Sequence, residues 1–163
     1  MQIIVKKNNT LLFDEFEFKC SIGLNGTTKN KYEGDKKTPK GNFSLGNLYF
    51  RKDRIKNIKT NLKKIPINKK MGWCDDTGSK HYNKLIKIPN KLKHEKMFRK
   101  DKTYDLVIPI KYNFKNPIKN RGSAIFLHLT KNYKKTVGCV ALKKKDLLIL
   151  LKLINKNTKI KIL

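Results

Sequence analysis

A histidine and a cysteine in the last third of the chain are the residues whose types and spacing best fit a chemical reaction. The apolar run 123–128 ends in His128, and eleven residues later Cys139 follows Gly138 and enters a second apolar run. A thiol acts as a nucleophile when a base lies within hydrogen-bond reach and a small neighbour lets a carbonyl approach. A tight, hairpin-like return would bring His128 beside Cys139. The pattern predicts nucleophilic chemistry; the alternative is a buried cysteine and a core histidine in a hairpin.

A tryptophan, a cysteine and two aspartates form a second cluster of chemically active residue types at 73–76. Cys74 and Asp75 or Asp76, together with His81, offer metal ligands, but their spacing fits no common zinc pattern. The two aspartates are also a candidate acid–base pair, although nothing in the sequence raises the pKa of one over the other. We therefore expect a structural or substrate-lining loop here, and no metal site.

The elements that must position these residues begin with strands. Segments 2–5 and 13–19 have the pattern of strands, the second with apolar and charged residues alternating as in a half-buried strand. Asn8 and Asn9 predict a turn between them. Residues 29–41 form a loop rich in turn-forming residues, and a loop of this length in a compact domain is more often functional than idle.

Strands also dominate the second half of the chain. We predict strands at 85–88 and 104–110, and a third in the run that ends in His128. The segment 91–99 is predicted to form a short helix that carries a few apolar side chains.

The clearest helix follows Leu142. Apolar residues recur over 147–154 at the i, i+3, i+4, i+7 spacing of one helix face, and Asp146 in the first turn complements the helix dipole. Ile160 and Ile162 alternate with lysines in a terminal strand. These patterns predict a mostly-β (α+β) fold, a sandwich or mixed sheet with one main C-terminal helix. The length predicts a single domain over residues 1–163.

The net charge is the strongest compositional signal. The chain has 40 Lys and Arg against 12 Asp and Glu, a formal charge of +28. Such a charge suits an anionic partner such as nucleic acid, an acidic polymer or a membrane face. The lysines are scattered over nearly every segment, however, as the codon usage of an AT-rich genome would produce. We therefore expect no specific nucleic-acid binding, only a general attraction for carboxylate-rich substrates; a basic nucleic-acid-binding module is the alternative.

Membrane and export signals are missing from these residues. No apolar run approaches the roughly 20 residues that cross a bilayer, so no transmembrane segment is expected. The first residues show no secretory signal peptide. The three cysteines are Cys20, Cys74 and Cys139, and an odd count leaves at least one outside any intrachain disulfide. Whether Cys20 and Cys74 pair stays open.

Several motifs, in their order along the chain, resemble those of the L,D-transpeptidase catalytic (YkuD-like) family. One of them, Thr38-Pro39-Lys40-Gly41-Asn42-Phe43, is similar to the family's threonine-proline-x-glycine-x-phenylalanine signature. The others are Glu33-Gly34-Asp35, Gly72-Trp73-Cys74-Asp75-Asp76, Tyr82-Asn83, Tyr104-Asp105-Leu106-Val107, the run 121–126, Phe126-Leu127-His128, Gly138-Cys139-Val140-Ala141-Leu142 and Asp146-Leu147-Leu148. Three features depart from the family pattern. Val137 stands where the family has a second histidine, and Ala141-Leu142 where an arginine or asparagine usually follows; the histidine-to-cysteine gap is also shorter.

The resemblance implies a YkuD-like fold and a cysteine-dependent acyl transfer in peptidoglycan biosynthesis, with a role in cell shape. Cys139 would be the nucleophile, His128 the general base and acid, and Gly138 part of the oxyanion region. The thiolate would form a thioester with a donor stem peptide, which an acceptor amine resolves to make a cross-link. Water in place of the amine would give an L,D-carboxypeptidase or endopeptidase. The resemblance implies no cofactor, and a backbone carbonyl that fixes the tautomer of His128.

Four further residues are predicted to contact the substrate: Arg121, Ser123, Trp73 and Tyr112. Arg121 would hold a stem carboxylate by a bidentate contact, or is an exposed loop arginine. Trp73 would line the donor groove or pack in the core, and Tyr112 has the same two alternatives. The substrate implies a periplasmic or cell-envelope location. The sequence leaves open which stem bond is cleaved, which cross-link is made and how the chain is exported.

Overall fold

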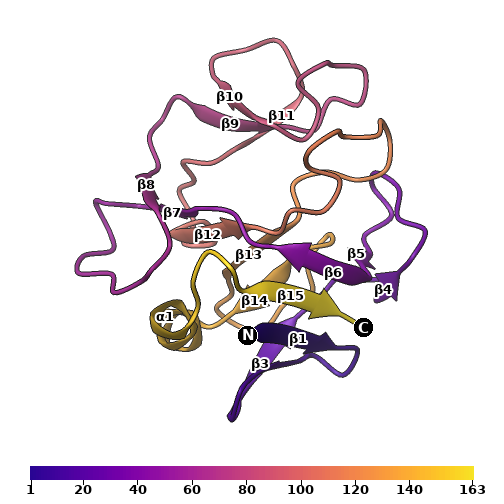
Figure 1. The fold of residues 1–163 in the computed structure, drawn as a ribbon. Coiled ribbons are helices and arrows are strands. Elements are labelled where there is room, and N and C mark those ends of the chain that lie inside the picture. Colours follow the sequence, from indigo (N-terminus) through magenta and orange to yellow (C-terminus); the bar gives the residue numbers. More distant parts are fainter.

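A ten-stranded mixed sheet curls around the core of this protein, whose computed structural model describes residues 1–163 (Figure 1). Its strands are, in sheet order, β6 (Gly41–Ser44), β15 (Lys159–Ile162), β1 (Gln2–Lys6), β2 (Thr10–Phe13), β3 (Phe16–Ser21), β14 (Val140–Leu142), β13 (Phe126–Leu129), β12 (Leu106–Pro109), β7 (Leu48–Phe50) and β8 (Lys64–Pro66). The helix α1 (Lys144–Leu153) completes the mostly-β fold with one C-terminal helix that the patterns predicted.

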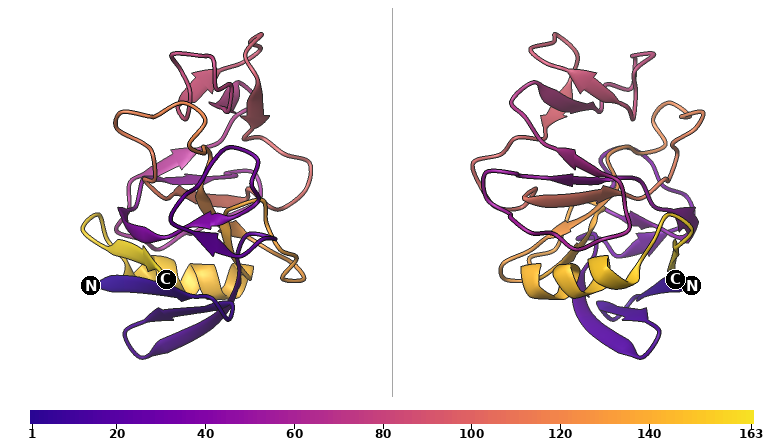
Figure 2. Two further views of the ribbon diagram at one scale, coloured as in Figure 1. Left: turned by 90° about the vertical axis from the view of Figure 1, so that its right-hand side faces the viewer. Right: turned by 60° about the vertical axis from the view of Figure 1, so that its left-hand side comes forward.

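Two small sheets stand apart from the large one. They are β10 (Leu85–Lys87), β9 (Met71–Cys74) and β11 (His94–Lys96) in one, and β4 (Thr27–Thr28) with β5 (Thr38–Pro39) in the other. Both views of Figure 2 place the three-stranded sheet at one end of the molecule and the N-terminal strands, with α1 beside them, toward the other. With its ten residues, α1 falls well short of the length and apolar character that a bilayer crossing requires.

The predicted strand at 13–19 is interrupted near its start. The chain turns at Asp14, whose φ is 49°, so that Phe13 ends β2 and Phe16 begins β3 directly opposite it. An aspartate tolerates this left-handed conformation in a two-residue hairpin turn. The prediction of one continuous strand was therefore wrong, because two hairpins in succession use this segment: β1 with β2, and β2 with β3.

The hairpin-like return from His128 to Cys139 was also wrong. β13 and β14 run parallel, with His128 opposite Ala141 and Leu127 opposite Val140. Residues 130–139 form the crossover connection between the two strands, which contains no helix. Within it, Thr136 forms an isolated β-bridge with Gly23. The parallel arrangement still brings the two residues to one cavity, since Cys139 directly precedes β14 while His128 lies within β13.

The centre of the sheet is buried on both faces, and the two faces have different partners. Alternate residues of a strand point to opposite faces. Leu127 and Leu129 join the main cluster of 26 buried apolar residues, to which α1 contributes Leu147, Leu150 and Leu151, and the residue after it, Ile154, also belongs. Phe126 lies on the other face in a separate cluster of 9 that includes Cys139. His128, two residues after Phe126, shares that second face.

The segment 91–99 forms a strand and not the predicted short helix. β11 pairs antiparallel with β9, with Glu95 opposite Trp73 and Lys96 opposite Gly72. The segment has no full apolar stripe to hold a helix against the core. Pairing with the free side of β9 satisfies its backbone instead, and Met97 becomes fully buried just after the strand. This tertiary pairing outweighs the local helical preference, and it carries Glu95 toward the face of the sheet that holds His128.

Candidate active site

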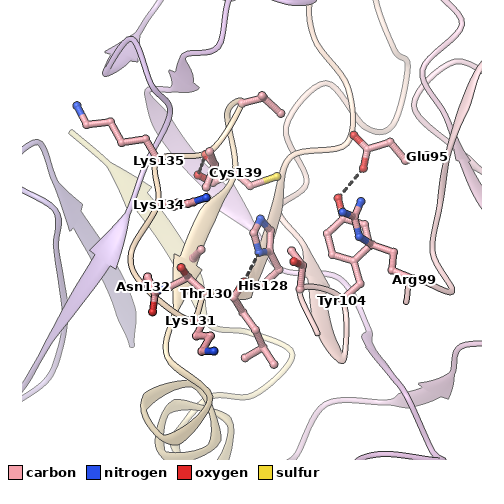
Figure 3. A pocket seen from close by; sticks show the side chains of 15 residues that line it. Glu95, Arg99, Tyr104, His128, Thr130, Lys131, Asn132, Lys134, Lys135 and Cys139 are labelled. Atoms are coloured by element: carbon pink, nitrogen blue, oxygen red, sulfur yellow. Dashed lines mark hydrogen bonds between the residues drawn. The ribbon is translucent and has the colours of Figure 1, made fainter. Parts of the chain in front are cut away.

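Cys139 and His128 line the same cavity, which has a volume of about 500 Å³. In the view of Figure 3 the Cys139 sulfur and the His128 ring lie on one side of the cavity, and Tyr104 and Glu95 lie on the other. Loop residues 130–137 form one rim and contribute Lys131, Lys134 and Lys135 among others.

The turn that presents Cys139 is shaped by a threonine and a glycine. The Thr136 hydroxyl donates to the Cys139 carbonyl (2.6 Å) and accepts from the Gly138 N–H (3.1 Å). Gly138 has a φ of 143°, and a side-chain carbon added there would lie 3.0 Å from the Lys37 carbonyl oxygen and 3.2 Å from Ile125. Conformation and space both require glycine at this position.

The thiol of Cys139 lies between two backbone groups of the segment that leads into β13. It donates to the Ala124 carbonyl and accepts from the Phe126 N–H, with 3.3 Å between heavy atoms in each case. Ala124 holds an unusual φ of 52°, and its own N–H is bound by Asn83. Burial raises the pKa of the Cys139 thiol to about 12, so the resting thiol is protonated.

The imidazole of His128 is held in one orientation by its own strand. Nδ1 lies 2.9 Å from the Leu129 carbonyl oxygen, and the ring packs edge-on against Tyr104 with 5.5 Å between ring centres. The expected backbone carbonyl partner is confirmed; because a carbonyl only accepts, Nδ1 carries the proton and Nε2 is free to accept one. Burial lowers the pKa of His128 to about 4, so the ring is neutral at pH 7.

The backbone amide of Cys139 is an unused donor at the site. The Gly138 N–H is engaged by Thr136, whereas the Cys139 N–H makes no hydrogen bond within the protein. An amide that is free before substrate arrives can donate to an oxyanion without first breaking another bond. The Cys139 amide is therefore the available donor, whereas that of Gly138, which was predicted to belong to the oxyanion region, is already engaged.

Glu95 is the single acidic side chain on the cavity wall. Its carboxylate accepts a 2.5 Å hydrogen bond from the Tyr104 hydroxyl, and Arg99 packs over the Tyr104 ring at 4.9 Å. Burial raises the pKa of Glu95 and also raises that of Tyr104 well above its ordinary value. The hydroxyl of Tyr104 therefore stays protonated and holds the carboxylate in place.

The predicted substrate-binding residues lie outside this cavity. Trp73 is buried, donates to Asn83 (2.9 Å) and packs edge-on against Phe126, whose ring centre is 5.1 Å away. Ser123 is buried and donates to Glu33 (2.8 Å). None of the predicted four is part of the cavity lining.

Tyr112 and Arg121 lie together on another part of the surface. The Tyr112 hydroxyl donates to the Arg121 carbonyl (2.6 Å), and the ring packs edge-on against Phe43. The guanidinium of Arg121 is exposed and bonds to no other residue. The structure thus joins these two residues to each other and does not bring them to Cys139.

All three cysteines are free thiols, which answers the question of pairing. Cys74 is fully buried against Ile86 and Ile88, and His81 is exposed. No cluster of three or more metal-ligating side chains forms anywhere in the chain. The 73–76 segment serves the packing of β9 against β10 and β11.

Sequence reasoning missed four residues that shape the site: Thr136, Glu95, Tyr104 and Lys31. Glu95 and Tyr104 came together only through strand pairing, which no local pattern revealed. Lys31 is buried beside Gly138, at 3% exposure, and ion-pairs with Asp35. Its i, i+4 spacing to Asp35, within the loop 29–41, was the signal that the sequence offered.

One family model matches nearly the whole chain. Residues 1–162 match the family model described as L,D-transpeptidase catalytic domain (YkuD). No curated protein matches the sequence at a significant level.

Three solved structures resemble the chain. Two are of the helical cell shape determining protein Pgp2 from Campylobacter jejuni, a mutant form (TM-score 0.54, 18% identity) and the unmutated form (TM-score 0.52, 16% identity), each covering 99% of this chain and 46% of that one. The third is an L,D-transpeptidase from Mycobacterium smegmatis (TM-score 0.47, 10% identity, 99% of this chain and 58% of that one). The likeness to Pgp2 shows the fold, and this chain spans less than half of the Pgp2 length. Because the family model matches nearly every residue, the chain belongs to the L,D-transpeptidase catalytic domain (YkuD) family.

Proposed function

We propose that this protein is a peptidoglycan L,D-transpeptidase in which Cys139 forms a thioester with a donor stem peptide. The observation that supports it best is that one thiol and one neutral imidazole line the same open cavity. Cys20 and Cys74 are buried elsewhere and line no part of this cavity. The proposed location is the periplasm or cell envelope, where peptidoglycan lies, and the proposed role is in the cell wall and cell shape.

The resting pair is neutral, so the proton moves when the substrate binds. Nε2 of His128 takes the proton of the Cys139 thiol as the sulfur attacks the donor carbonyl, and the C=O electron pair moves onto oxygen. The Cys139 N–H donates to this oxyanion; one such donor is typically worth about 3 kcal/mol. Collapse to the thioester breaks the C–N bond, and the imidazolium returns its proton to the leaving amine.

The second half of the reaction regenerates the thiol. The acceptor amine attacks the thioester carbonyl and gives its proton to Nε2 of His128, and the sulfur leaves as the new amide forms. The released thiolate then recovers the proton from the imidazolium. Water following the same path would give a hydrolase, so the attacking group alone separates the two activities.

The charge of the cavity rim suits a carboxylate-rich substrate. Lys131, Lys134 and Lys135 surround an opening whose single acid, Glu95, is already held by Tyr104. Stem peptides carry several carboxylates, which the rim attracts before the scissile bond reaches the sulfur. Val137, at 67% exposure, adds an apolar contact at this rim, where the family has a second histidine.

The proposal is tested with a purified disaccharide–tetrapeptide donor and intact-protein mass spectrometry. We expect native protein to gain the mass of one acyl group, and Cys139→Ala to gain none because the sulfur is gone. Cys20→Ala is the matched control, since it removes a buried thiol away from the cavity and should acylate as native does. An acyl adduct on Cys139→Ala excludes the mechanism.

Adding an acceptor amine separates transferase from hydrolase. Native protein with donor alone should accumulate acyl-enzyme, and an added acceptor stem should convert it to a cross-linked dimer detectable by chromatography. Release of donor acid at the same rate with and without acceptor would assign the chain to the carboxypeptidase or endopeptidase class instead.

A further inference from the structure

A buried lysine lies against Gly138, the residue that precedes Cys139. The Lys31 ammonium is 3.7 Å from where a side-chain carbon of Gly138 would begin, and it does not line the cavity. Its three donors have two partners in the protein, the Asp35 carboxylate (2.6 Å) and the Tyr32 carbonyl (3.3 Å). Neither solvent nor substrate reaches this charge, because the residue is only 3% exposed.

The local structure is built to admit the lysine. Gly122 has a φ of 93°, and a side-chain carbon there would come within 2.8 Å of the Lys31 stem. Gly138 has a φ of 143° and adjoins the ammonium. The side chain therefore runs between two glycines that leave room for it, one before β13 and one beside Cys139.

The partner of Lys31 stays charged. Burial favours the neutral form of Asp35, but hydrogen bonds from Lys31 and from the Lys37 and Tyr32 N–H groups outweigh it and lower the pKa of this carboxyl. A buried ion pair is by itself weak evidence for a stabilising role, because the desolvation of both ions offsets their attraction. The ammonium adjoins the turn that carries Cys139, so its charge can also act on groups in that turn.

We propose that Lys31 is a positioning residue that acts electrostatically, stabilising negative charge on the Cys139 sulfur and on the oxyanion beside the Cys139 amide. The inference rests on the proposed nucleophilic role of Cys139. Burial raises the pKa of the thiol, and the nearby Glu95 carboxylate raises it further, whereas the Lys31 charge and the Phe126 N–H act in the opposite direction. In a surrounding of lower dielectric than water, the effect of a buried charge is larger than at the surface and less screened by salt.

Other charged and titratable groups face the sulfur from the cavity side. Glu95, Arg99 and Tyr104 line the wall opposite, and His128 is neutral at pH 7. The rim lysines are exposed, so solvent and bound carboxylates weaken their effect. Lys31 is the cation that remains fixed when the substrate arrives.

Alkylation of Cys139 by iodoacetamide tests the proposal without any substrate. The reagent is uncharged, so its rate follows the thiolate fraction and access. Lys31→Met should slow modification of Cys139 about tenfold at fixed pH between 8 and 10. This is equivalent to moving the plot of alkylation rate against pH toward higher pH by about one pH unit. Lys31→Arg should restore most of the rate. The site of modification is read by peptide mass, with Cys139→Ala as the blank.

The sign of the change separates electrostatics from structural damage. A loosened site exposes the buried thiol and alkylates faster, whereas loss of the ammonium makes it slower. A rate for Lys31→Met equal to or above native therefore overturns the proposal. Should Lys31→Met fail to fold by circular dichroism, Asp35→Asn decides: it keeps the lysine, removes its counter-charge and should speed alkylation, and an unchanged or slower rate overturns the proposal. Thioester formation is measured separately, so the proposed function and this inference fail independently.

Discussion

Burial keeps both Cys139 and His128 uncharged in the resting protein. The pKa of the thiol is raised to about 12 and that of the imidazole is lowered to about 4, in each case because the apolar surroundings disfavour the charged form. The pair is thus not a preformed ion pair, and the thiol is less reactive than an exposed cysteine until a substrate brings the carbonyl and new hydrogen bonds.

Replacement of His128 by glutamine should weaken the acid sensitivity of the fold. Unfolded histidine binds a proton below about pH 6.5, whereas folded His128 stays neutral down to about pH 4. The unfolded state therefore binds more protons in this window, and the free energy of unfolding of native protein falls as pH falls. As the pH falls from about 6.5 to about 4, the free energy of unfolding should decrease by about 3 kcal/mol more for native protein than for His128→Gln. Urea titrations at a series of pH values measure this, and parallel curves for the two proteins would contradict it.

Gly138→Ala should lower both stability and acylation. The added carbon meets the Lys37 carbonyl oxygen at 3.0 Å, and the φ of 143° strains any L side chain. We expect a loss of about 2–4 kcal/mol in the free energy of unfolding. Gly34→Ala is the control: its φ is 79° and nothing lies within 4 Å of the added carbon, so the cost should stay near 1 kcal/mol. Equal losses for the two variants would show that the close contact is unimportant.

Residue types predicted the Cys139–His128 pair, but not its electrostatic environment. The spacing and the small neighbour Gly138 were visible in the sequence, and the family resemblance implied a backbone carbonyl as the partner of His128. Glu95 and Lys31 were not predicted as site residues, because each reaches the site by long-range packing: one from β11, the other from the loop 29–41.

Among the elements, α1 was the most predictable. Its buried and exposed faces also allow a direct test of how it packs against the core. Leu150 is fully buried in the main cluster, whereas its neighbour Ile149 is 38% exposed. Leu150→Ala should reduce the free energy of unfolding by about 2–5 kcal/mol, and Ile149→Ala by less than about 1 kcal/mol. Denaturant midpoints with unchanged slopes measure both. Similar losses would mean that α1 does not dock through this face.

Strand pairing was less predictable than helix position. Apolar runs located the segments of β12 and β13, and alternation located β15. Neither pattern encodes which strand lies beside which or in which direction. A hairpin was therefore predicted for β13 and β14, although they are parallel. A helix was predicted for the segment 91–99, although it forms β11 and pairs with β9. Partner choice depends on the whole sheet, and a local pattern contains no information about it.

At the scale of the whole molecule, the charge of +28 should make stability depend on salt. Like charges repel across the compact state, and added salt shortens the range of this repulsion from about 30 Å at 0.01 M to about 8 Å at 0.15 M. We expect NaCl over this range to raise stability by about 1 kcal/mol, which for a chain of this size raises Tm by roughly 2–4 °C.

A charge-reversal variant provides the control for the salt effect. Lys56→Glu with Lys59→Glu, two exposed positions away from the cavity, should raise Tm at low salt and reduce the response to NaCl. Calorimetry measures both. A Tm that falls with NaCl would show that attractive ion pairs outweigh the general repulsion.

The position of β15 between β6 and β1 has a consequence for how the protein is made. β15 pairs parallel with β1 and antiparallel with β6, joining Ile3 to Ile160 and Phe43 to Ile160 across most of the chain. Until the ribosome has added residue 162, the nascent polypeptide therefore keeps two open sheet edges, which invite pairing with other chains. The large sheet is complete only after synthesis has passed this point, so β1 and β6 are left longest without the strand that lies between them.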